Sequence, residues 1–216
     1  MKSYKLVIFD WDGTVMDSVT KIVNCMHQSA ILCGLVAPSD EATANIIGLS
    51  LEQAVATLFP NDADLYADLI AGYKHQYKYV DVTPTPLFEG VEQTLAALKN
   101  SGVLLAVATG KSRAGLERLL DETKLRNYFV ATRTSDDALS KPAPDMLLQL
   151  LDELNMSALD ALMVGDTKID MAMAKAANID RLGVTMGVHN AQQLQEFAPI
   201  ATVDSYQQLG ALLLDR

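Results

Sequence analysis

Positive charge, cysteine and long apolar runs are all scarce in this sequence, and each shortage excludes a class of protein. Of its 216 residues, 17 are Lys or Arg and 27 are Asp or Glu, giving a formal net charge of −10. Nucleic acid and anionic membrane surfaces attract basic proteins, so we expect neither as a partner. No apolar run reaches the roughly 18 residues that a membrane-spanning helix needs.

The two cysteines, Cys25 and Cys33, lie in an apolar segment and lack the spacing of a metal site. We therefore expect reduced, buried thiols. The sequence opens on a strand-like run rather than a charged segment followed by an apolar one, so we expect a cytoplasmic protein. Apolar residues make up 50% and charged residues 20%, which is typical of a folded chain.

Short apolar runs predict five strands, the last of them weaker, at residues 6–9, 103–109, 128–132, 161–165 and 181–185. Leucine-rich helical patterns separate the later runs. This alternation of strands and helices predicts an α/β fold, in which helices cover both faces of a parallel sheet.

The long stretch between the first two predicted strands contains no strand pattern, and it is too long to be a loop of a compact domain. Its apolar residues instead recur with helical spacing. We predict an inserted helical domain at residues 16–84 and an α/β core domain formed by residues 1–15 and 85–216. Prolines in the segment 83–87 would stiffen the return to the core.

Polar side chains follow three of the predicted strands. The first run is followed by Asp10 and Asp12, the second ends in Thr109 and is followed by Gly110, and the fourth is followed by Asp166. In an open parallel sheet, ligands bind beyond the carboxyl ends of the strands, so these residues are candidates for one site. Two neighbouring carboxylates repel unless a cation or a shared proton compensates them, which indicates a divalent metal. The alternative is that the two aspartates only cap a turn.

Lys141 and Asp170 extend this candidate set. Backbone N–H groups, a hydroxyl and a lysine bind phosphate oxygens, and Mg²⁺ prefers carboxylate, phosphate and water oxygens. An aspartate can also act as a nucleophile and form an aspartyl-phosphate. Together these residues indicate metal-assisted phosphoryl transfer.

Four ordered motifs resemble those of the haloacid dehalogenase superfamily: DWDGT at 10–14, Thr109 at a strand end, Lys141, and GDTKID at 165–170. The resemblance covers nearly the whole chain and is closest to the phosphoglycolate phosphatase-like members. It implies a Rossmann-like core with a helical C1 cap inserted after the first motif. It also implies a Mg²⁺ cofactor and a small phosphate ester, similar to phosphoglycolate, as the substrate.

The resemblance implies a role for each matched residue. Asp10 would be the nucleophile and a magnesium ligand. Asp12 would be the general acid and then the base, and its backbone carbonyl would bind the metal. The Thr109 side chain and the Gly110 amide would hold the phosphoryl oxygens, and the loop of residues 48–50 resembles the cap loop that selects the leaving group.

Three further residues complete this assignment. Lys141 would neutralise the nucleophile and the developing charge, and Asp166 would complete the metal site. Asp170 has two open roles, as a metal ligand or as the residue that orients Lys141. Dehalogenases lack an acid/base aspartate at the position of Asp12, so its presence favours phosphate esters as substrates.

Other functions use the same residue types. A phosphosugar mutase would use the same two aspartates, and a pyrophosphatase or 5′-nucleotidase would fit the same core. Outside the enzymes, a phospho-aspartate signalling receiver also combines a strand-end aspartate, a Thr or Ser, and a lysine. We expect a hydrolytic enzyme that is a monomer or a homodimer.

Overall fold

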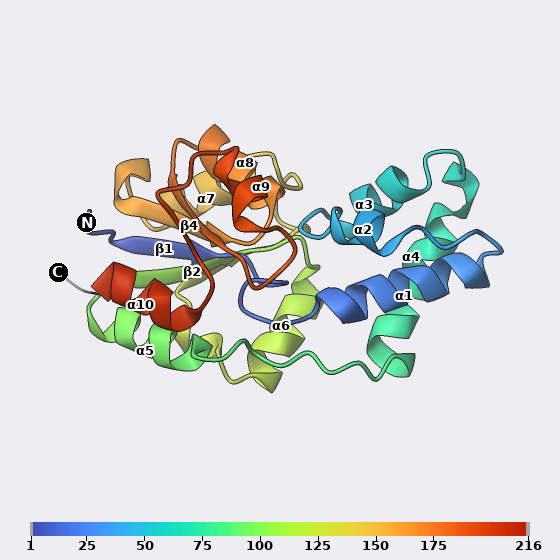
Figure 1. Ribbon diagram of the computed structural model, residues 1–216, viewed down its shortest axis with the longest axis horizontal. Coiled ribbons are helices and arrows are strands. Elements are labelled where there is room, and N and C mark those ends of the chain that lie inside the picture. Colours follow the sequence, from blue (N-terminus) through green and yellow to red (C-terminus); the bar gives the residue numbers. More distant parts are fainter. Residues whose placement is uncertain (1, 215–216) are drawn as a thin grey trace.

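A six-stranded parallel sheet forms the centre of the computed structural model, which describes residues 2–214 (Figure 1). The strands are β1 (Leu6–Phe9), β2 (Leu104–Ala108), β3 (Ala131–Arg133), β4 (Ala161–Gly165), β5 (Asp180–Val184) and β6 (Ala201–Val203). Their order across the sheet is β3-β2-β1-β4-β5-β6. Because β1 pairs with both β2 and β4, the carboxyl ends of these three strands are neighbours.

The apolar runs predict five of the six strands, and the differences have local causes. The third run predicts a strand at residues 128–132, but β3 begins only at Ala131 because Arg126–Tyr128 form a short 3-10 helix, η3. Strand β6 is not predicted, since its three residues include a threonine and form no apolar run. The α/β fold with a parallel sheet is confirmed.

Helices cover both faces of the sheet. They are α5 (Val91–Asn100), α6 (Arg113–Glu122) and α10 (Tyr206–Leu214) on one face, and α7 (Asp145–Glu153) and α8 (Lys168–Ala176) on the other. Side chains of β1 alternate between them: Val7 and Phe9 enter the first apolar cluster, while Leu6 and Ile8 enter the second. Two shorter elements are α9 (Ala191–Gln195) and η4 (Ala158–Asp160).

The chain between β1 and α5 forms a separate group of helices, on the right of Figure 1. We call this group the cap; its elements are α1 (Val19–Leu32), α2 (Asp40–Ala44), α3 (Leu51–Leu58), η1 (Ala63–Leu65), α4 (Tyr66–His75) and η2 (Gln76–Val80). The cap has an apolar cluster of its own, which includes Met26, Val55 and Leu69. The exact domain boundaries stay a prediction.

Two segments that run side by side connect the cap to the sheet. The backbone N–H of Asp17 donates to the carbonyl of Pro86 at 2.9 Å, and Met16 forms an antiparallel bridge with Leu87. The cap is therefore tied to the core next to the carboxyl end of β1.

Both cysteines are free thiols: Cys25 is buried, whereas Cys33 is half-buried, so full burial was the wrong expectation for the second. Among residues 2–214, no helix combines the length and the apolar character needed to span a membrane.

Candidate active site

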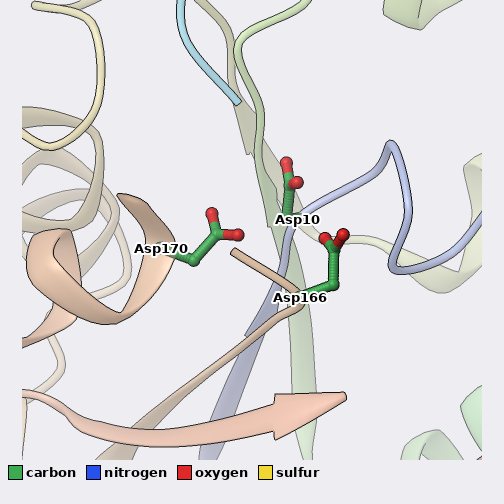
Figure 2. A group of neighbouring side chains, drawn as sticks. All are labelled: Asp10, Asp166 and Asp170. Atoms are coloured by element: carbon green, nitrogen blue, oxygen red, sulfur yellow. The ribbon is translucent and has the colours of Figure 1, made fainter. Parts of the chain in front are cut away.

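Three aspartates meet at the carboxyl edge of the sheet. Asp10 directly follows β1, Asp166 directly follows β4, and Asp170 lies in the first turn of α8. Figure 2 shows Asp10 and Asp166 side by side, with the carboxylate of Asp170 pointing towards them. All three are buried, and one carboxylate oxygen from each lies within 4.8 Å of the others.

Asp10 combines deep burial with one unpaired oxygen. Its Oδ1 accepts a hydrogen bond from the Lys141 ammonium at 2.7 Å, whereas Oδ2 has no hydrogen-bond partner among the described residues. Burial raises the pKa of Asp10 to about 7, the Lys141 charge opposes this shift, and the charge of Asp170 adds to it. A further cation beside the open oxygen would therefore favour the ionised form of this carboxyl.

Lys141 lies fully buried between two carboxylates. Its Nζ donates to Asp10 Oδ1 and to Asp170 Oδ1, both at 2.7 Å. Burial disfavours the charged ammonium, but the two carboxylates outweigh this effect and raise the pKa of Lys141. The lysine is therefore a fixed cation beside Asp10.

Both oxygens of Asp170 are already engaged. Oδ1 accepts from Lys141, and Oδ2 accepts from the hydroxyl and the backbone N–H of Thr167, at 2.6 and 3.1 Å, in the capping box that begins α8. This geometry favours the second of its two open roles, the orientation of Lys141.

Asp166 is held by donors and enclosed by glycines. Thr14 Oγ1 and the backbone N–H of Val188 each donate to its carboxylate at 2.8 Å. A Cβ at Gly13 or at Gly187 would collide with this carboxylate, so the side chain occupies space that only glycines leave free. Burial, together with the charges of its acidic neighbours, raises the pKa of Asp166.

This cluster fits a divalent cation. It holds three buried carboxylates against one ammonium, and the open Oδ2 of Asp10 is the kind of oxygen that Mg²⁺ binds. From the part of the chain that the structure describes, each carboxylate oxygen of Asp166 accepts a single hydrogen bond, from a neutral donor, which leaves a lone pair on each for a cation. Asp10 and Asp166 are therefore the side chains that could hold the metal.

Asp12 faces a different set of partners. Its Oδ1 accepts from Ser18 Oγ at 2.5 Å and pairs with Lys111 Nζ at 2.9 Å. Between the two aspartates, Trp11 points away into the apolar core, where its ring lies against Phe129. The alternation expected from the sequence therefore places Asp10 and Asp12 on one side of the chain.

Thr109 and Gly110 leave β2 next to Asp10, and the cap approaches them closely. A Cβ at Gly110 would collide with the backbone carbonyls of Gly48 and Leu49. The backbone N–H of Ser50 also donates to Ser140 Oγ at 2.8 Å. The cap loop of residues 48–50 thus lies directly against the predicted phosphate-binding residues.

A cavity of about 320 Å³ opens between the cap and the core. Its core side is lined by Asp10, Asp12, Thr109, Gly110 and Lys111, and its cap side by residues of α1, α3, α4, η2 and the cap loop. A reacting group in this cavity would therefore lie beside Asp10 and Asp12. The structure brings all seven predicted site residues to one edge of the sheet, and their individual roles stay predictions.

Two further residues near Asp12 were not foreseen from the sequence as part of the site. Ser18 precedes the first cap helix, and its contact with Asp12 depends on a turn that no residue pattern marks. Tyr77 fits a helical apolar stripe, which predicts only packing, yet its ring faces Lys111 across the cavity.

The parallel sheet, with carboxylates at its strand ends, is typical of an α/β enzyme. Comparisons with known proteins identify the family. The family model described as haloacid dehalogenase-like hydrolase matches residues 7–184. The chain therefore belongs to the haloacid dehalogenase-like hydrolases.

Curated relatives match over almost their whole length. The chain is 34% identical over 209 residues to "Probable phosphatase IndB" of Dickeya dadantii, covering 94% of this chain and 91% of that protein. It is 29% identical to a phosphoglycolate phosphatase of Vibrio cholerae, covering 99% and 97%. Among solved structures, a predicted phosphatase from Clostridium acetobutylicum is similar with a TM-score of 0.88, at 26% identity and full coverage of both chains.

Proposed function

We propose that this protein is a Mg²⁺-dependent phosphatase that hydrolyses the phosphate monoester of a small metabolite through an aspartyl-phosphate on Asp10. The family and the names of several relatives, phosphoglycolate phosphatase among them, support this class of reaction. Phosphoglycolate is accordingly the first substrate to test. A cytoplasmic location and a monomeric or dimeric state stay predictions.

One observation carries the proposal: Asp10 Oδ2 is buried and unpaired within residues 2–214, while Oδ1 is fixed by Lys141. A buried oxygen without a partner is costly unless a ligand completes it. The cavity leads to this residue, so a substrate phosphoryl group can reach it.

In the first step, an oxygen of Asp10 attacks phosphorus, and the bond from phosphorus to the alcohol oxygen breaks. Asp12 gives its proton to the departing alcohol. The Thr109 hydroxyl and the Gly110 amide hold phosphoryl oxygens, and Lys141 offsets the negative charge that gathers around Asp10. Aspartyl-phosphate and free alcohol are the products of this step.

In the second step, Asp12 takes a proton from water as the water oxygen attacks phosphorus. The bond between phosphorus and Asp10 breaks, releasing inorganic phosphate and restoring both carboxyl groups. Mg²⁺, held by Asp10, Asp166 and the backbone carbonyl of Asp12, would supply positive charge that lets a phosphate dianion approach a carboxylate.

The test is phosphate release from a panel of 2-phosphoglycolate, glucose 6-phosphate, a nucleoside 5′-monophosphate and pyrophosphate, each with Mg²⁺ and with EDTA. We expect release that requires Mg²⁺. If the folded, magnesium-loaded protein releases no phosphate from any of them, the proposal is wrong. Conversion that requires a bisphosphate activator and releases little phosphate would indicate a mutase instead.

Asp10→Asn tests the nucleophile directly. The amide is nearly isosteric with the carboxylate but cannot form the acyl phosphate, so turnover should fall below detection while the far-UV circular dichroism stays unchanged. Near-normal turnover in this variant would remove Asp10 from the role of nucleophile.

A further inference from the structure

The cap side of the cavity is mostly apolar. It is formed by side chains that include Ile22, Met26, Ile46, Leu51, Tyr73 and Tyr77. The phosphoryl group must lie at the core side, beside Asp10, so the alcohol portion of a substrate lies against these cap residues. The cavity of about 320 Å³ corresponds to roughly ten water volumes, which is more than a phosphoryl group and a two-carbon acid fill.

Two of the four cations that line the cavity in the described part of the chain are already paired with carboxylates. Lys111 is paired with Asp12, and Arg118 Nη1 lies 2.8 Å from both carboxylate oxygens of Glu122. Lys74 and Lys78 line the cavity too, but both are exposed to solvent. A carboxylate held against the apolar cap would therefore lose hydration, and the two cations left to pair with it are exposed lysines, whose ion pairs are weak because water screens them.

Tyr73 and Tyr77 add two aromatic rings to this side of the cavity, and the ammonium groups of Lys21 and Lys111 lie over the Tyr77 ring, 5.2 and 4.9 Å from its centroid. Tyr73 in α4 and Tyr77 in η2 are separated by about one helical turn, and their ring centroids lie 5.9 Å apart. The hydroxyl of Tyr77 is buried, and among the described residues it has no hydrogen-bond partner. Burial raises the pKa of Tyr77 and the nearby Lys111 ammonium opposes this shift, so Lys111 already faces the hydroxyl, and a polar atom of a bound ligand would add a second partner to it.

We propose that the cap selects phosphate monoesters whose alcohol portion is uncharged and carries a ring, aromatic or heteroaromatic, that packs against Tyr73 and Tyr77. This inference rests on the proposed phosphatase activity. It places small carboxylated alcohols, glycolate included, among the poorer leaving groups of this enzyme.

Three substrates test the proposal on the unmodified protein: benzyl phosphate, ethyl phosphate and 2-phosphoglycolate. Each releases a primary alcohol. This alcohol carries a ring in benzyl phosphate, a carboxylate in 2-phosphoglycolate, and neither group in ethyl phosphate. We expect kcat/KM to be about tenfold or more higher for benzyl than for ethyl phosphate, because the ring is buried, and lowest for 2-phosphoglycolate. Magnesium-dependent hydrolysis in which 2-phosphoglycolate equals or exceeds benzyl phosphate would overturn the inference but leave the phosphatase intact. Failure with all three, together with release of phosphate from another member of the panel above, would also overturn the inference alone, whereas failure with every ester tested would overturn the phosphatase itself.

A pair of cap variants checks where the ring binds. Ala54 of α3 lines the cavity, whereas Ala56, on the same helix, does not. Ala54→Leu should lower the ratio of benzyl to ethyl phosphate kcat/KM severalfold, because the added side chain occupies the space for the ring. Ala56→Leu should leave the ratio unchanged. Equal benzyl-to-ethyl ratios in both variants would contradict the placement of the substrate ring beside Ala54. Partial loss of folded enzyme lowers both kcat/KM values alike, so it does not change this ratio.

Discussion

Asp12 is held by two donors at the same oxygen, and this arrangement bears on its proposed role as the acid. Ser18 and Lys111 both contact Oδ1, so within the described chain the hydrogen bonds of this side chain leave Oδ2 for proton exchange. Lys111 is itself fixed, because its Nζ lies 4.9 Å from the centroid of the Tyr77 ring. Burial opposes the charge of Lys111, but Asp12 outweighs this effect and raises the pKa of the lysine.

Lys111→Met should therefore lower kcat while leaving KM nearly unchanged. Loss of the ion pair lets Asp12 move, and a small misplacement of a catalytic group costs about 10²-fold in rate. The loss should be greater for ethyl phosphate than for p-nitrophenyl phosphate, whose leaving group needs less protonation. Steady-state kinetics on both substrates measure this, and Lys111→Arg should recover part of the rate.

Lys5→Met is the matched control, because Lys5 pairs with Asp160 at 3.2 Å at the opposite end of β1. It should leave both kinetic constants unchanged. A higher KM with unchanged kcat in Lys111→Met would mean that this lysine binds substrate rather than positioning Asp12.

How far the site can be predicted depends on what places each residue. Asp10 and Asp166 directly follow buried apolar strands, so the sequence alone predicts that they are close. The contact of Lys111 with Asp12 depends on two turns, and that of Tyr77 with Lys111 depends on the position of the cap; neither leaves a periodic pattern. Predictions from sequence therefore succeed for strand-end residues and fail for contacts made across the cavity.

At the scale of elements, the central strands are predicted well from the sequence and the edge strands poorly. β1 and β4 are buried on both faces and read as continuous apolar runs. β3 and β6 lie at the two edges of the sheet and have only three residues each. An edge strand needs fewer apolar side chains, so its limits are set by neighbouring turns rather than by composition.

The contact of the cap loop with Gly110 predicts the effect of one added methyl group. In Gly110→Ala, the new Cβ would collide with backbone atoms of Gly48 and Leu49, which cannot rotate away as a side chain can. The cap loop must shift, so kcat/KM should fall about 10²-fold with only a small change in melting temperature.

Enzyme assays and thermal unfolding measure both quantities. Gly210→Ala is the control: a Cβ there meets only side-chain atoms, the nearest at 3.5 Å, and alanine favours the helix α10. It should be active and at least as stable as the unmodified protein. An equally active Gly110→Ala would show that the loop contact is not needed for turnover.

His189 joins the core to the cap. The backbone N–H of Lys168 donates to Nδ1 at 3.1 Å, so the proton of the neutral ring lies on Nε2, which donates to Asn45 Oδ1 at 3.0 Å. Burial, with the charge of Lys168 adding to it, lowers the pKa of His189. Protonation at Nδ1 would cost the ring its contact with the Lys168 amide.

A histidine whose pKa is lowered by folding takes up its proton first in the unfolded chain. The free energy of unfolding should thus fall as pH drops below about 6.5, the pKa of an unperturbed histidine. His189→Gln should unfold about 1 kcal/mol more easily at pH 7, and it should lose less stability between pH 7 and 5.5. Urea unfolding at both values measures this, and the exposed His75→Gln serves as control. An unchanged pH dependence in His189→Gln would contradict the assignment.

At the scale of the whole molecule, a protein with a net charge of −10 has to attract an anionic substrate. The overall field repels a phosphate ester, so attraction has to be local. Lys141 alone cannot supply it, because it already faces the carboxylates of Asp10 and Asp170. Under the proposed function, Mg²⁺ bound at the buried acidic cluster would both help the substrate to approach and stabilise the cluster itself.

Removal of the metal should accordingly destabilise the entire fold. In EDTA, the buried carboxyl groups of Asp10 and Asp166 have raised pKa values, so they favour the protonated form, and the free energy of unfolding should fall as pH rises from about 4 to 8. Mg²⁺ at about 100 times its dissociation constant should raise the melting temperature by about 5–10 °C at pH 8. Thermal unfolding in EDTA and in Mg²⁺, at matched ionic strength, measures the shift.

Asp166→Asn should be less sensitive to EDTA and should lose most of the Mg²⁺-dependent rise in melting temperature. Asp160→Asn, far from the cluster, should keep that rise. A melting temperature that is independent of Mg²⁺ in the unmodified protein would mean that these carboxylates are stabilised without a metal, through protons and Lys141 alone.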